Sequence, residues 1–305
     1  MSVSKIAIIG VGAVGSTIAY TLLLKNMATE IMLVDVDEVR CEGEVLDLAD
    51  ALLSSRTARI VKASFSQAAQ ADIIIICVGA RQQVGQTRIE LLDTNKRIIS
   101  SLCSRLQPLN KSAIVIVVTN PVDIITYCVH EHMELPRNQI FGSGTFLDTQ
   151  RLLGIIGSSI SVSPQSIDAF VLGEHGDSQF VAWSLANVGG IPITSYPHMT
   201  AQELQHIEQL TKQRADEIIS CKGATYFGIA ACVGRMCEAI VFSQRFVFPL
   251  STFHEEYKVC LSLPVVLGRN GIEKQLAVPL NMQEERKLYE SAQVLQKTMD
   301  RSINV

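Results

Sequence analysis

The stretch Ile6-Ala7-Ile8-Ile9-Gly10-Val11-Gly12-Ala13-Val14-Gly15 decides the fold. A short apolar run, as in a buried strand, leads into three glycines spaced G-x-G-x-x-G, and a segment of helical composition follows. Glycines at this spacing permit a tight turn, let N–H groups at the start of a helix approach a pyrophosphate, and let helix and strand pack closely. The stretch therefore predicts a strand, a turn and a helix that bind a dinucleotide.

An acidic residue strengthens this prediction. Asp35 stands twenty residues beyond Gly15, at the end of the second predicted strand, where a carboxylate accepts hydrogen bonds from a ribose. Val36 follows it, and an acid without a neighbouring arginine favours NAD over NADP, whose 2′-phosphate it would repel. The first candidate cofactor-binding residues are Gly10, Gly12, Ala13, Val14, Gly15 and Asp35.

The N-terminal half alternates apolar runs with helical segments, which is typical of a parallel sheet covered on both faces. Each run is apolar along its whole length, as doubly covered strands are. The predicted strands are 6–9, 30–34, 58–62, 73–78 and 114–118. The predicted helices are 14–24, 42–53, 87–106 and 122–131. The fold class expected is α/β, a Rossmann-type doubly wound parallel sheet followed by an α+β substrate domain.

Length, charge and cysteine content exclude several classes of protein. The chain has 305 residues, enough for one large domain or two joined ones. Its net charge of −4, with both signs mixed, argues against a nucleic-acid or polybasic membrane partner. The sequence begins without a signal peptide and has no bilayer-spanning apolar run. Its eight scattered cysteines form no C-x-x-C pair, so we expect reduced core residues in a cytoplasmic protein, without a metal site.

A polar loop follows the fourth predicted strand, beginning at Gly79-Ala80 and ending near Arg88. A loop at the carboxyl end of a parallel strand lies over the cofactor crevice, and it could close as a lid. Taken alone, the segment is also consistent with a solvated loop that carries two surface arginines, Arg81 and Arg88. The fifth predicted strand ends in Thr119-Asn120-Pro121, which puts the amide of Asn120 at the same edge of the sheet.

The regular alternation of predicted strands and helices ends near residues 143–148. We expect a dinucleotide-binding domain over 1–143 and a substrate domain over 144–305, packed together without a linker. In the second domain we expect a strand over 167–172 and a hairpin at Arg269-Asn270-Gly271, because Asn-Gly is a strong hairpin signal. The helices expected there are 148–156, 200–221, 225–242 and 282–299.

A single histidine lies between two glycines and two carboxylates in Gly173-Glu174-His175-Gly176-Asp177, directly after the predicted strand 167–172. An imidazole held at a strand end can pass a proton to or from a substrate oxygen. The octapeptide 171–178 alone fits a solvated loop histidine equally well. Asp148 and Arg151, three apart at the start of a predicted helix, share one of its sides; the carboxylate could orient the imidazole and the guanidinium could grip a substrate carboxylate. Alone, such a pair is more often a surface ion pair.

Taken together, these motifs resemble the L-lactate and malate dehydrogenase family, and within it the L-lactate dehydrogenases. The resemblance covers nearly all 305 residues. It is carried by Gly10-x-Gly12-x-x-Gly15 with Asp35, Ala80-Arg81-Gln82-Gln83 through Arg88, Thr119-Asn120-Pro121-Val122-Asp123, Leu147-Asp148-x-x-Arg151, Gly173-Glu174-His175-Gly176-Asp177 and Lys222-Gly223-Ala224-Thr225. It implies an NAD-dependent enzyme of glycolysis and lactate fermentation that transfers hydride between NADH and pyruvate.

The resemblance also implies a role for each matched residue. His175 would carry the proton, Asp148 would orient it, Arg151 would anchor the substrate carboxylate, and Arg88, on the lid, would polarise the ketone. The other implied contacts are Asn120 with substrate and nicotinamide, Thr225 with substrate, Ile229 with nicotinamide, Arg81 with the pyrophosphate, and Gly79 and Ala80 beside the cofactor.

Gln82 bears on the choice of substrate. The residue six before the lid arginine is arginine in the malate enzymes and is Gln82 here, although Arg81 stands one position away. The alternatives are a malate or bulkier 2-hydroxy-acid dehydrogenase and, from another class, a structural protein that has kept the fold. The set His175, Asp148, Arg151 and Arg88 argues against a structural role.

Regulation and assembly rest on the resemblance alone. Bacterial members activated by fructose 1,6-bisphosphate carry a basic residue at positions that hold Leu153 and Asp168 here, so we expect no such activation. Family habit implies a homotetramer.

Overall fold

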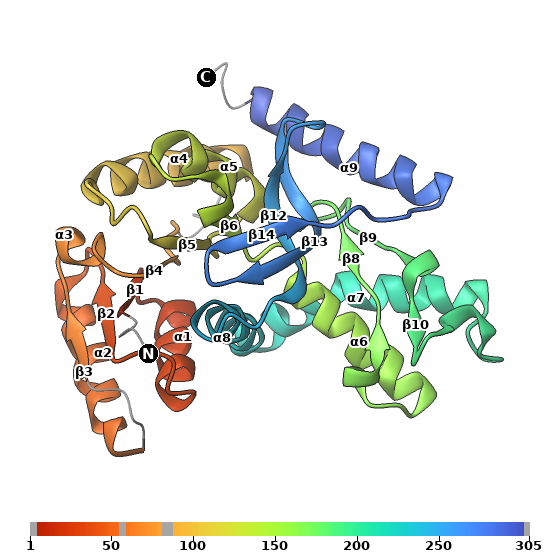
Figure 1. Ribbon diagram of the computed structural model, residues 1–305, viewed down its shortest axis with the longest axis horizontal. Coiled ribbons are helices and arrows are strands. Elements are labelled where there is room, and N and C mark those ends of the chain that lie inside the picture. The colour runs from red at the N-terminus through yellow and green to blue at the C-terminus, as the bar shows by residue number, and fades with distance from the viewer. Residues whose placement is uncertain (1–4, 55–58, 81–87, 302–305) are drawn as a thin grey trace.

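The computed structural model describes residues 5–54, 59–80 and 88–301 (Figure 1). Its centre is a nine-stranded sheet with strand order β14-β13-β12-β6-β5-β4-β1-β2-β3. The first six strands run parallel to one another. They are β1 (Lys5–Ile9), β2 (Glu30–Val34), β3 (Arg59–Lys62), β4 (Ile73–Ile76), β5 (Ile114–Val117) and β6 (Ile140–Gly142). The α/β, doubly wound class predicted from the sequence is confirmed.

Successive side chains along each strand point to opposite faces of the sheet, and both faces are apolar, so helices cover both. Ile6 and Ile8 of β1 belong to one buried cluster, whereas Ala7 and Ile9 belong to another on the opposite face. The first cluster is closed by α1 (Ala13–Leu24) and α8 (Phe227–Val241), and the second by α4 (Arg88–Arg105) and α5 (Val122–His132). Figure 1 shows α1 beside α8 on one side of the sheet and α4 and α5 on the other.

The sequence prediction for this half differs from the structure in two helices and one strand. The helix predicted over 42–53 is α2 (Glu38–Asp50), which begins four residues earlier because the Asp37 side chain caps it, accepting a hydrogen bond from the Arg40 amide at 3.0 Å. One turn of helix, α3 (Phe65–Ala68), was not predicted, and its start is fixed by a capping box at Ser64. The strand β6 was also missed, since three residues carry too little periodicity to detect.

The second half of the chain extends the same sheet. The antiparallel strands β12 (Phe246–His254), β13 (Val259–Gly268) and β14 (Gly271–Gln275) join it through the pairing of Ser251 with Gly142 of β6. The predicted hairpin lies between β13 and β14, with Gly271 at φ 85°. The remaining long helices are α6 (Phe146–Ile160), α7 (Ala201–Lys222) and α9 (Met282–Arg301).

The strand predicted over 167–172 is broken into two. Its halves, β7 (Ile167–Asp168) and β8 (Val171–Leu172), pair with different partners, so the chain turns between them. β8 pairs with β9 (Phe180–Val181). β7 pairs with β10 (Asn187–Val188), and β10 also pairs with β11 (Ile191–Pro192). Short 3₁₀ turns connect the elements at Leu52–Ser54, Arg137–Gln139, Pro164–Ser166, Trp183–Leu185 and Ile193–Ser195.

The eight cysteines are free thiols, most of them buried. Among the described residues, no helix is long and apolar enough to cross a bilayer. Within that same part of the chain, no group of three or more His, Cys, Asp or Glu side chains is arranged to hold a metal.

The glycines of the turn between β1 and α1 differ in whether a residue with a side chain could replace them. Gly10 has φ 93°, a left-handed conformation that other residues adopt at a cost. A Cβ on Gly15 would lie 1.9 Å from the Gly10 carbonyl oxygen, so only glycine lets α1 approach β1 this closely. A Cβ on Gly12 would meet no atom within 4 Å among residues 5–54, 59–80 and 88–301.

Gly15→Ala is therefore expected to destabilise the protein by about 2–4 kcal/mol, because helix and strand must separate to admit the methyl group. Thermal unfolding should show a melting temperature lower than wild type by roughly 5 °C or more. Gly12→Ala is the matched control and should melt close to the wild type. Equal melting temperatures for both variants would contradict the close approach at Gly15.

Candidate active site

The carboxyl ends of β1 and β2 form one wall of the site. Gly12, the N-cap of α1, has no side chain to bond the first amides of the helix, and no atom of the described residues lies within 4 Å of a Cβ built there, so the helix N-terminus can present its amides to a ligand. An open helix N-terminus beside a glycine turn fits the pyrophosphate of a dinucleotide. Gly10, Ala13 and Val14 lie in the same turn.

Asp35 is held beside this turn by main-chain donors. Its Oδ2 accepts a hydrogen bond from the Val11 amide at 2.7 Å, and its Oδ1 accepts one from the Asp37 amide at 3.0 Å. A carboxylate has further lone pairs, which leaves acceptor capacity for the hydroxyls of a ribose. The residues at the ends of β1 and β2 thus suit both the pyrophosphate and the adenosine ribose of NAD.

An asparagine that sequence reasoning missed ties the next two strand ends together. Asn95 of α4 is buried; its Oδ1 accepts from the Ala80 amide at 2.9 Å and its Nδ2 donates to the Asn120 carbonyl at 3.1 Å. Gly79, Ala80 and Asn120 are therefore brought to one edge of the sheet, next to the glycine turn. A polar side chain in the middle of a helix was the available signal.

The structure describes the proposed lid residues only in part. Arg81 and Gln82 lie outside the described residues. Arg88 is the first residue of α4, and its side chain also lies outside what the structure describes. Ile229 lies in the first turn of α8 and is partly buried against the core cluster that includes α1.

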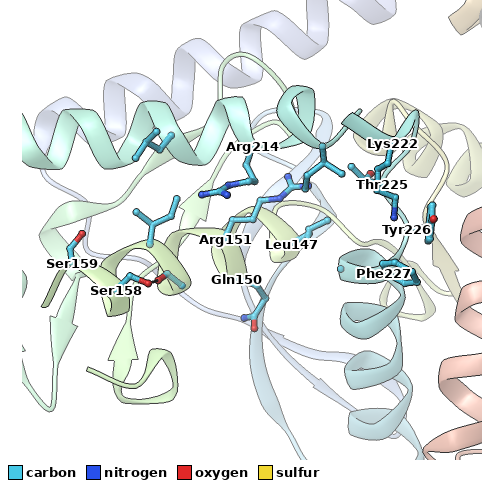
Figure 2. A pocket seen from close by; sticks show the side chains of 15 residues that line it. Leu147, Gln150, Arg151, Ser158, Ser159, Arg214, Lys222, Thr225, Tyr226 and Phe227 are labelled. Carbon is cyan, nitrogen blue, oxygen red and sulfur yellow. Dashed lines mark hydrogen bonds between the residues drawn. The ribbon is translucent and has the colours of Figure 1, made fainter. Parts of the chain in front are cut away.

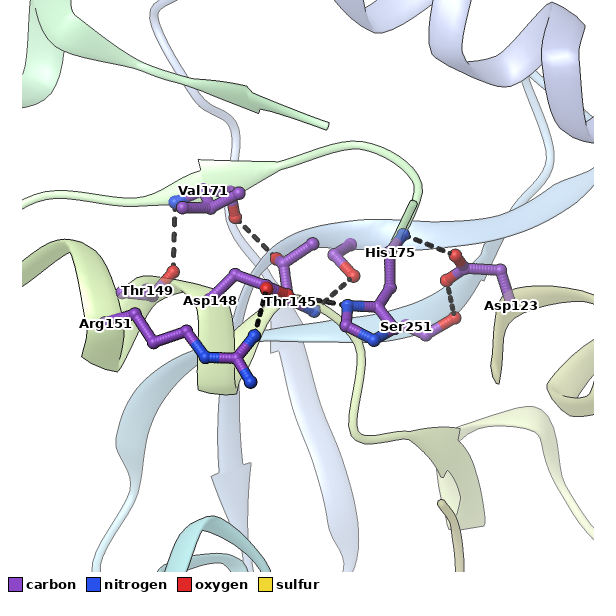
Figure 3. A network of polar contacts seen from close by, with 9 residues as sticks. Asp123, Thr145, Asp148, Thr149, Arg151, Val171, His175 and Ser251 are labelled. Atoms are coloured by element: carbon purple, nitrogen blue, oxygen red, sulfur yellow. Dashed lines mark hydrogen bonds and ion pairs between the residues drawn. The ribbon is translucent and has the colours of Figure 1, made fainter. Parts of the chain in front are cut away.

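The histidine loop begins directly after β8, and its imidazole meets a buried carboxylate. The Nδ1 of His175 lies 2.6 Å from Oδ2 of Asp148, and Nη1 of Arg151 donates to the other oxygen, Oδ1, at 3.0 Å (Figure 3). Asp148 is only 2% exposed. With Asp148 as the acceptor of the Nδ1 proton, Nε2 is left to face a substrate.

Threonines that sequence reasoning missed lock α6 against β8. Thr145 Oγ1 donates to the Val171 carbonyl at 2.5 Å, and the Val171 amide donates to Thr149 Oγ1 at 2.9 Å. Because these bonds join the first turn of α6 to the strand that leads into the loop, Asp148 and His175 are held in fixed register. The ion pair of Asp148 with Arg151, which the sequence suggested, is thus buried and does not lie on the surface.

The electrostatics of this group favour a protonated imidazole. Burial by itself lowers the pKa of His175, but the charge and hydrogen bond of Asp148 outweigh it and raise the pKa to about 9. For Asp148, burial acts to raise the pKa, while His175 and Arg151 outweigh it and hold the pKa below its usual value. The imidazole therefore carries a proton at neutral pH, as a proton donor must.

The side chain of Arg151 also lines a cavity of about 620 Å³ between α6, α7 and the start of α8. Thr225 and Arg214 line the same cavity, and Figure 2 shows the side chains of Arg151 and Arg214 beside each other. Lys222 closes one end, with its Nζ 3.4 Å from the centre of the Tyr226 ring. Arg214 and Lys222 were not predicted as part of a site.

Comparison with protein families accounts for almost the whole chain. Residues 4–142 match the lactate/malate dehydrogenase, NAD binding domain, and residues 145–305 match the lactate/malate dehydrogenase, alpha/beta C-terminal domain. The chain is 44% identical over 292 residues to L-lactate dehydrogenase A of Rhizopus oryzae, covering 96% of this chain and 91% of that one. It is 37% identical over 306 residues to an L-lactate dehydrogenase of Clostridium botulinum strain Okra, covering 97% and 96%.

Solved structures of similar proteins have the same fold. A lactate dehydrogenase from a Medee basin deep-sea metagenome library superimposes with a TM-score of 0.95 at 34% identity, covering 99% of both chains. The minor L-lactate dehydrogenase of Enterococcus mundtii, in a ligand-bound form, gives 0.95 at 31% identity with the same coverage.

The contact between His175 and Asp148 predicts a specific pH dependence of stability. Because the folded pKa of the imidazole lies above its ordinary 6.5, the stabilisation is complete below pH 6.5 and is lost as pH rises through about 9. In Asp148→Asn, which lacks the charge, the stability difference from wild type should therefore shrink across this window, by on the order of 2 kcal/mol.

The measurement is thermal unfolding of both proteins across this pH range. Ser158→Ala, on the same helix, is the control; it removes the hydrogen bond from Ser158 Oγ to the Gly154 carbonyl but no charge, so its difference from wild type should not depend on pH. A difference for Asp148→Asn that stays constant or grows over the window would rule out the raised imidazole pKa.

Proposed function

The chain belongs to the lactate/malate dehydrogenase family, and from this premise we propose that it catalyses the NAD-dependent interconversion of pyruvate and L-lactate. The observation that carries the proposal is the contact of His175 with the buried carboxylate of Asp148, which also pairs with Arg151. The names of its relatives, L-lactate dehydrogenases at 37% and 44% identity, support the same activity.

His175 is the proposed proton carrier. With pyruvate bound, Nε2 donates a proton to the ketone oxygen, and it takes the proton back when lactate is oxidised. Asp148 keeps the opposite nitrogen protonated and stabilises the cationic ring. This division of labour needs a histidine that is protonated at neutral pH, which the raised pKa of His175 provides.

Arg151 is the proposed anchor of the substrate carboxylate. Its side chain is 10% exposed and lines the cavity, so a carboxylate could pair with the guanidinium through two hydrogen bonds while water is largely excluded. Thr225 lines the same cavity and would contact the substrate from the connection between α7 and α8. Asn120 would reach it from the end of β5, and we retain Arg88 and Gln82 as proposed lid residues that polarise the ketone and face the substrate's far end.

The bound cofactor supplies the hydride that moves to or from C2 of the substrate. The chain's part is to hold it. The open start of α1 and Asp35 would bind its phosphates and adenosine ribose, and Gly79 and Ala80 would lie beside it. Arg81 is the proposed pyrophosphate contact, and Ile229 would pack against the nicotinamide.

Substrate size and charge separate this proposal from its rivals. A malate dehydrogenase needs a cation for the second carboxylate of its substrate, and Gln82 at the lid provides none. Arg214 and Lys222 also line the cavity and carry positive charge, so oxaloacetate must be compared directly. A purely structural role is disfavoured because it has no need of a protonated histidine bonded to a buried carboxylate.

Domain division, assembly and location complete the proposal. We divide the chain into an NAD-binding domain at 1–143 and a catalytic domain at 144–305; the boundaries of the family matches support this. A cytoplasmic homotetramer that acts in glycolysis and lactate fermentation follows from family habit. Free thiols fit a reducing compartment.

We also propose that fructose 1,6-bisphosphate is not required. Leu153 and Asp168 line one surface cavity of about 870 Å³ and bring no positive charge to it. Arg235 and Arg245 line it as well, but Arg245 is paired with Glu273 at 2.8 Å. A bisphosphate site needs several cations that are free to pair with phosphate.

The deciding experiment follows NADH absorbance with pyruvate, oxaloacetate and 2-oxo-4-methylpentanoate side by side. We expect the largest kcat/KM with pyruvate, because Arg151 anchors one carboxylate and Gln82, the residue proposed to face the substrate's far end, is uncharged. His175→Asn should lower kcat by about 10²- to 10⁴-fold while NADH still binds, since the cofactor contacts lie on the other strand ends.

Preference for oxaloacetate would point to the malate alternative, and preference for the branched 2-oxo acid to a bulkier substrate. No turnover of any of the three would remove the proposed function. Millimolar fructose 1,6-bisphosphate added to the pyruvate arm should leave the saturation curve unchanged; a marked fall in KM would contradict the proposed independence from it.

A further inference from the structure

A second buried carboxylate supports the histidine loop from the opposite side. Asp123, in the first turn of α5, is 2% exposed. Its Oδ2 accepts the main-chain N–H of His175 at 2.7 Å, and its Oδ1 accepts the hydroxyl of Ser251 at 2.6 Å (Figure 3). The side chain thereby joins α5, β12 and the histidine loop at one point.

These hydrogen bonds alone do not require a charge. An asparagine could accept the His175 amide with its oxygen and donate its amide to Ser251, whose hydroxyl also accepts. Within the part of the chain that the structure describes, no lysine or arginine forms an ion pair with Asp123. Burial raises the pKa of Asp123 to about 6, although the bonds from Ser251 and His175 act to lower it.

The carboxylate is therefore ionised at neutral pH in a place where its charge is costly. The cation beside it is the imidazole of His175. Asp148 shares its negative charge between His175 and Arg151. A second carboxylate near the ring therefore offsets the positive charge of the protonated imidazole, whose proton the reaction uses. In keeping with this, the charge of Asp123 acts to raise the pKa of His175.

We propose that Asp123 is a positioning residue for the proton carrier, an inference that rests on the proposed function. Its carboxylate holds the histidine loop by the main-chain N–H of His175 and supplies the second negative charge beside the imidazole. The substrate is not touched by Asp123; its effect passes through His175.

Other charged groups also face this pair and define what the test must separate. Asp148 and Arg151 approach His175 from α6, and Glu174 lies on its own loop. Glu174 and the Cys260 thiol of β13 lie close to Asp123. All of them are unchanged in a substitution at Asp123, so a change in the titration of His175 reports the lost carboxylate.

The first test is an NMR titration of the histidine rings in wild type and Asp123→Asn, with the His175 signal assigned by its absence in His175→Asn. The titration midpoint of His175 should fall by about one pH unit in Asp123→Asn, because the variant keeps the hydrogen-bonding shape and loses the charge. This readout does not depend on turnover.

Glu284→Gln is the matched control. Glu284 is also buried, at 5% exposure, and also accepts a main-chain N–H and a hydroxyl, both from Ser184. It is not among the groups that shift His175, so its variant should titrate as the wild type does. A midpoint in Asp123→Asn equal to that in Glu284→Gln would overturn the inference.

The second test separates the charge from the hydrogen bond. Asp123→Asn should lower kcat/KM for pyruvate mainly above neutral pH, where His175 has lost its proton in the variant but not in the wild type. Asp123→Ala also loses the acceptor of the His175 amide and should lower kcat by a further factor of about ten. Equal kcat values for the two variants would overturn the positioning role.

If Asp123→Ala fails to fold, the Asn variant and its titration still decide the question. A wild-type enzyme without activity on any 2-oxo acid would count against the proposed function. The NMR midpoints would then still show whether Asp123 acts on His175.

Discussion

The 2.6 Å contact between His175 and Asp148 is the interaction on which the rest of the site depends. It requires a carboxylate that stays ionised although it is almost fully buried, and Arg151 and the imidazole together make that possible. It also requires the first turn of α6 and the loop after β8 to lie in fixed register. The hydrogen bonds of Thr145 and Thr149 to the main chain of Val171 maintain that register.

The fold brings this contact to the cofactor crevice through the mixed sheet. Parallel strands β1 to β6 place their carboxyl ends along one edge, and the antiparallel strands β12 to β14 continue the sheet from β6. Ser251 of β12 therefore lies beside Asp123 of α5, and both lie beneath the histidine loop. The histidine loop follows β8 of the separate β8–β9 pair, and the bridge of Gly173 with Ser262 of β13 joins this loop to the large sheet. The cofactor-binding strand ends and the proposed proton carrier are therefore held in one framework.

Much of this could be read from the sequence, because local patterns determine it. The glycine turn, Asp35 and the apolar strands gave the doubly wound fold, and the spacing of Asp148 and Arg151 gave their shared helix face. Short elements were lost: β6 has three residues, and the strand over 167–172 divides because its halves pair in different sheets. Roles that depend on distant contacts were harder to predict. Asn95 was visible only as a polar residue in the middle of a helix, and the partners of Asp123 lie far along the chain.

The central claim is that buried carboxylates keep His175 protonated well above neutral pH. The pH dependence of kcat/KM for pyruvate in the wild-type enzyme tests it most directly, because this parameter reports the ionisation of the free enzyme. With the pKa of His175 raised to about 9, kcat/KM should show a plateau through neutral pH and a fall centred near pH 9. A fall centred near pH 6.5, the ordinary value for histidine, would contradict it.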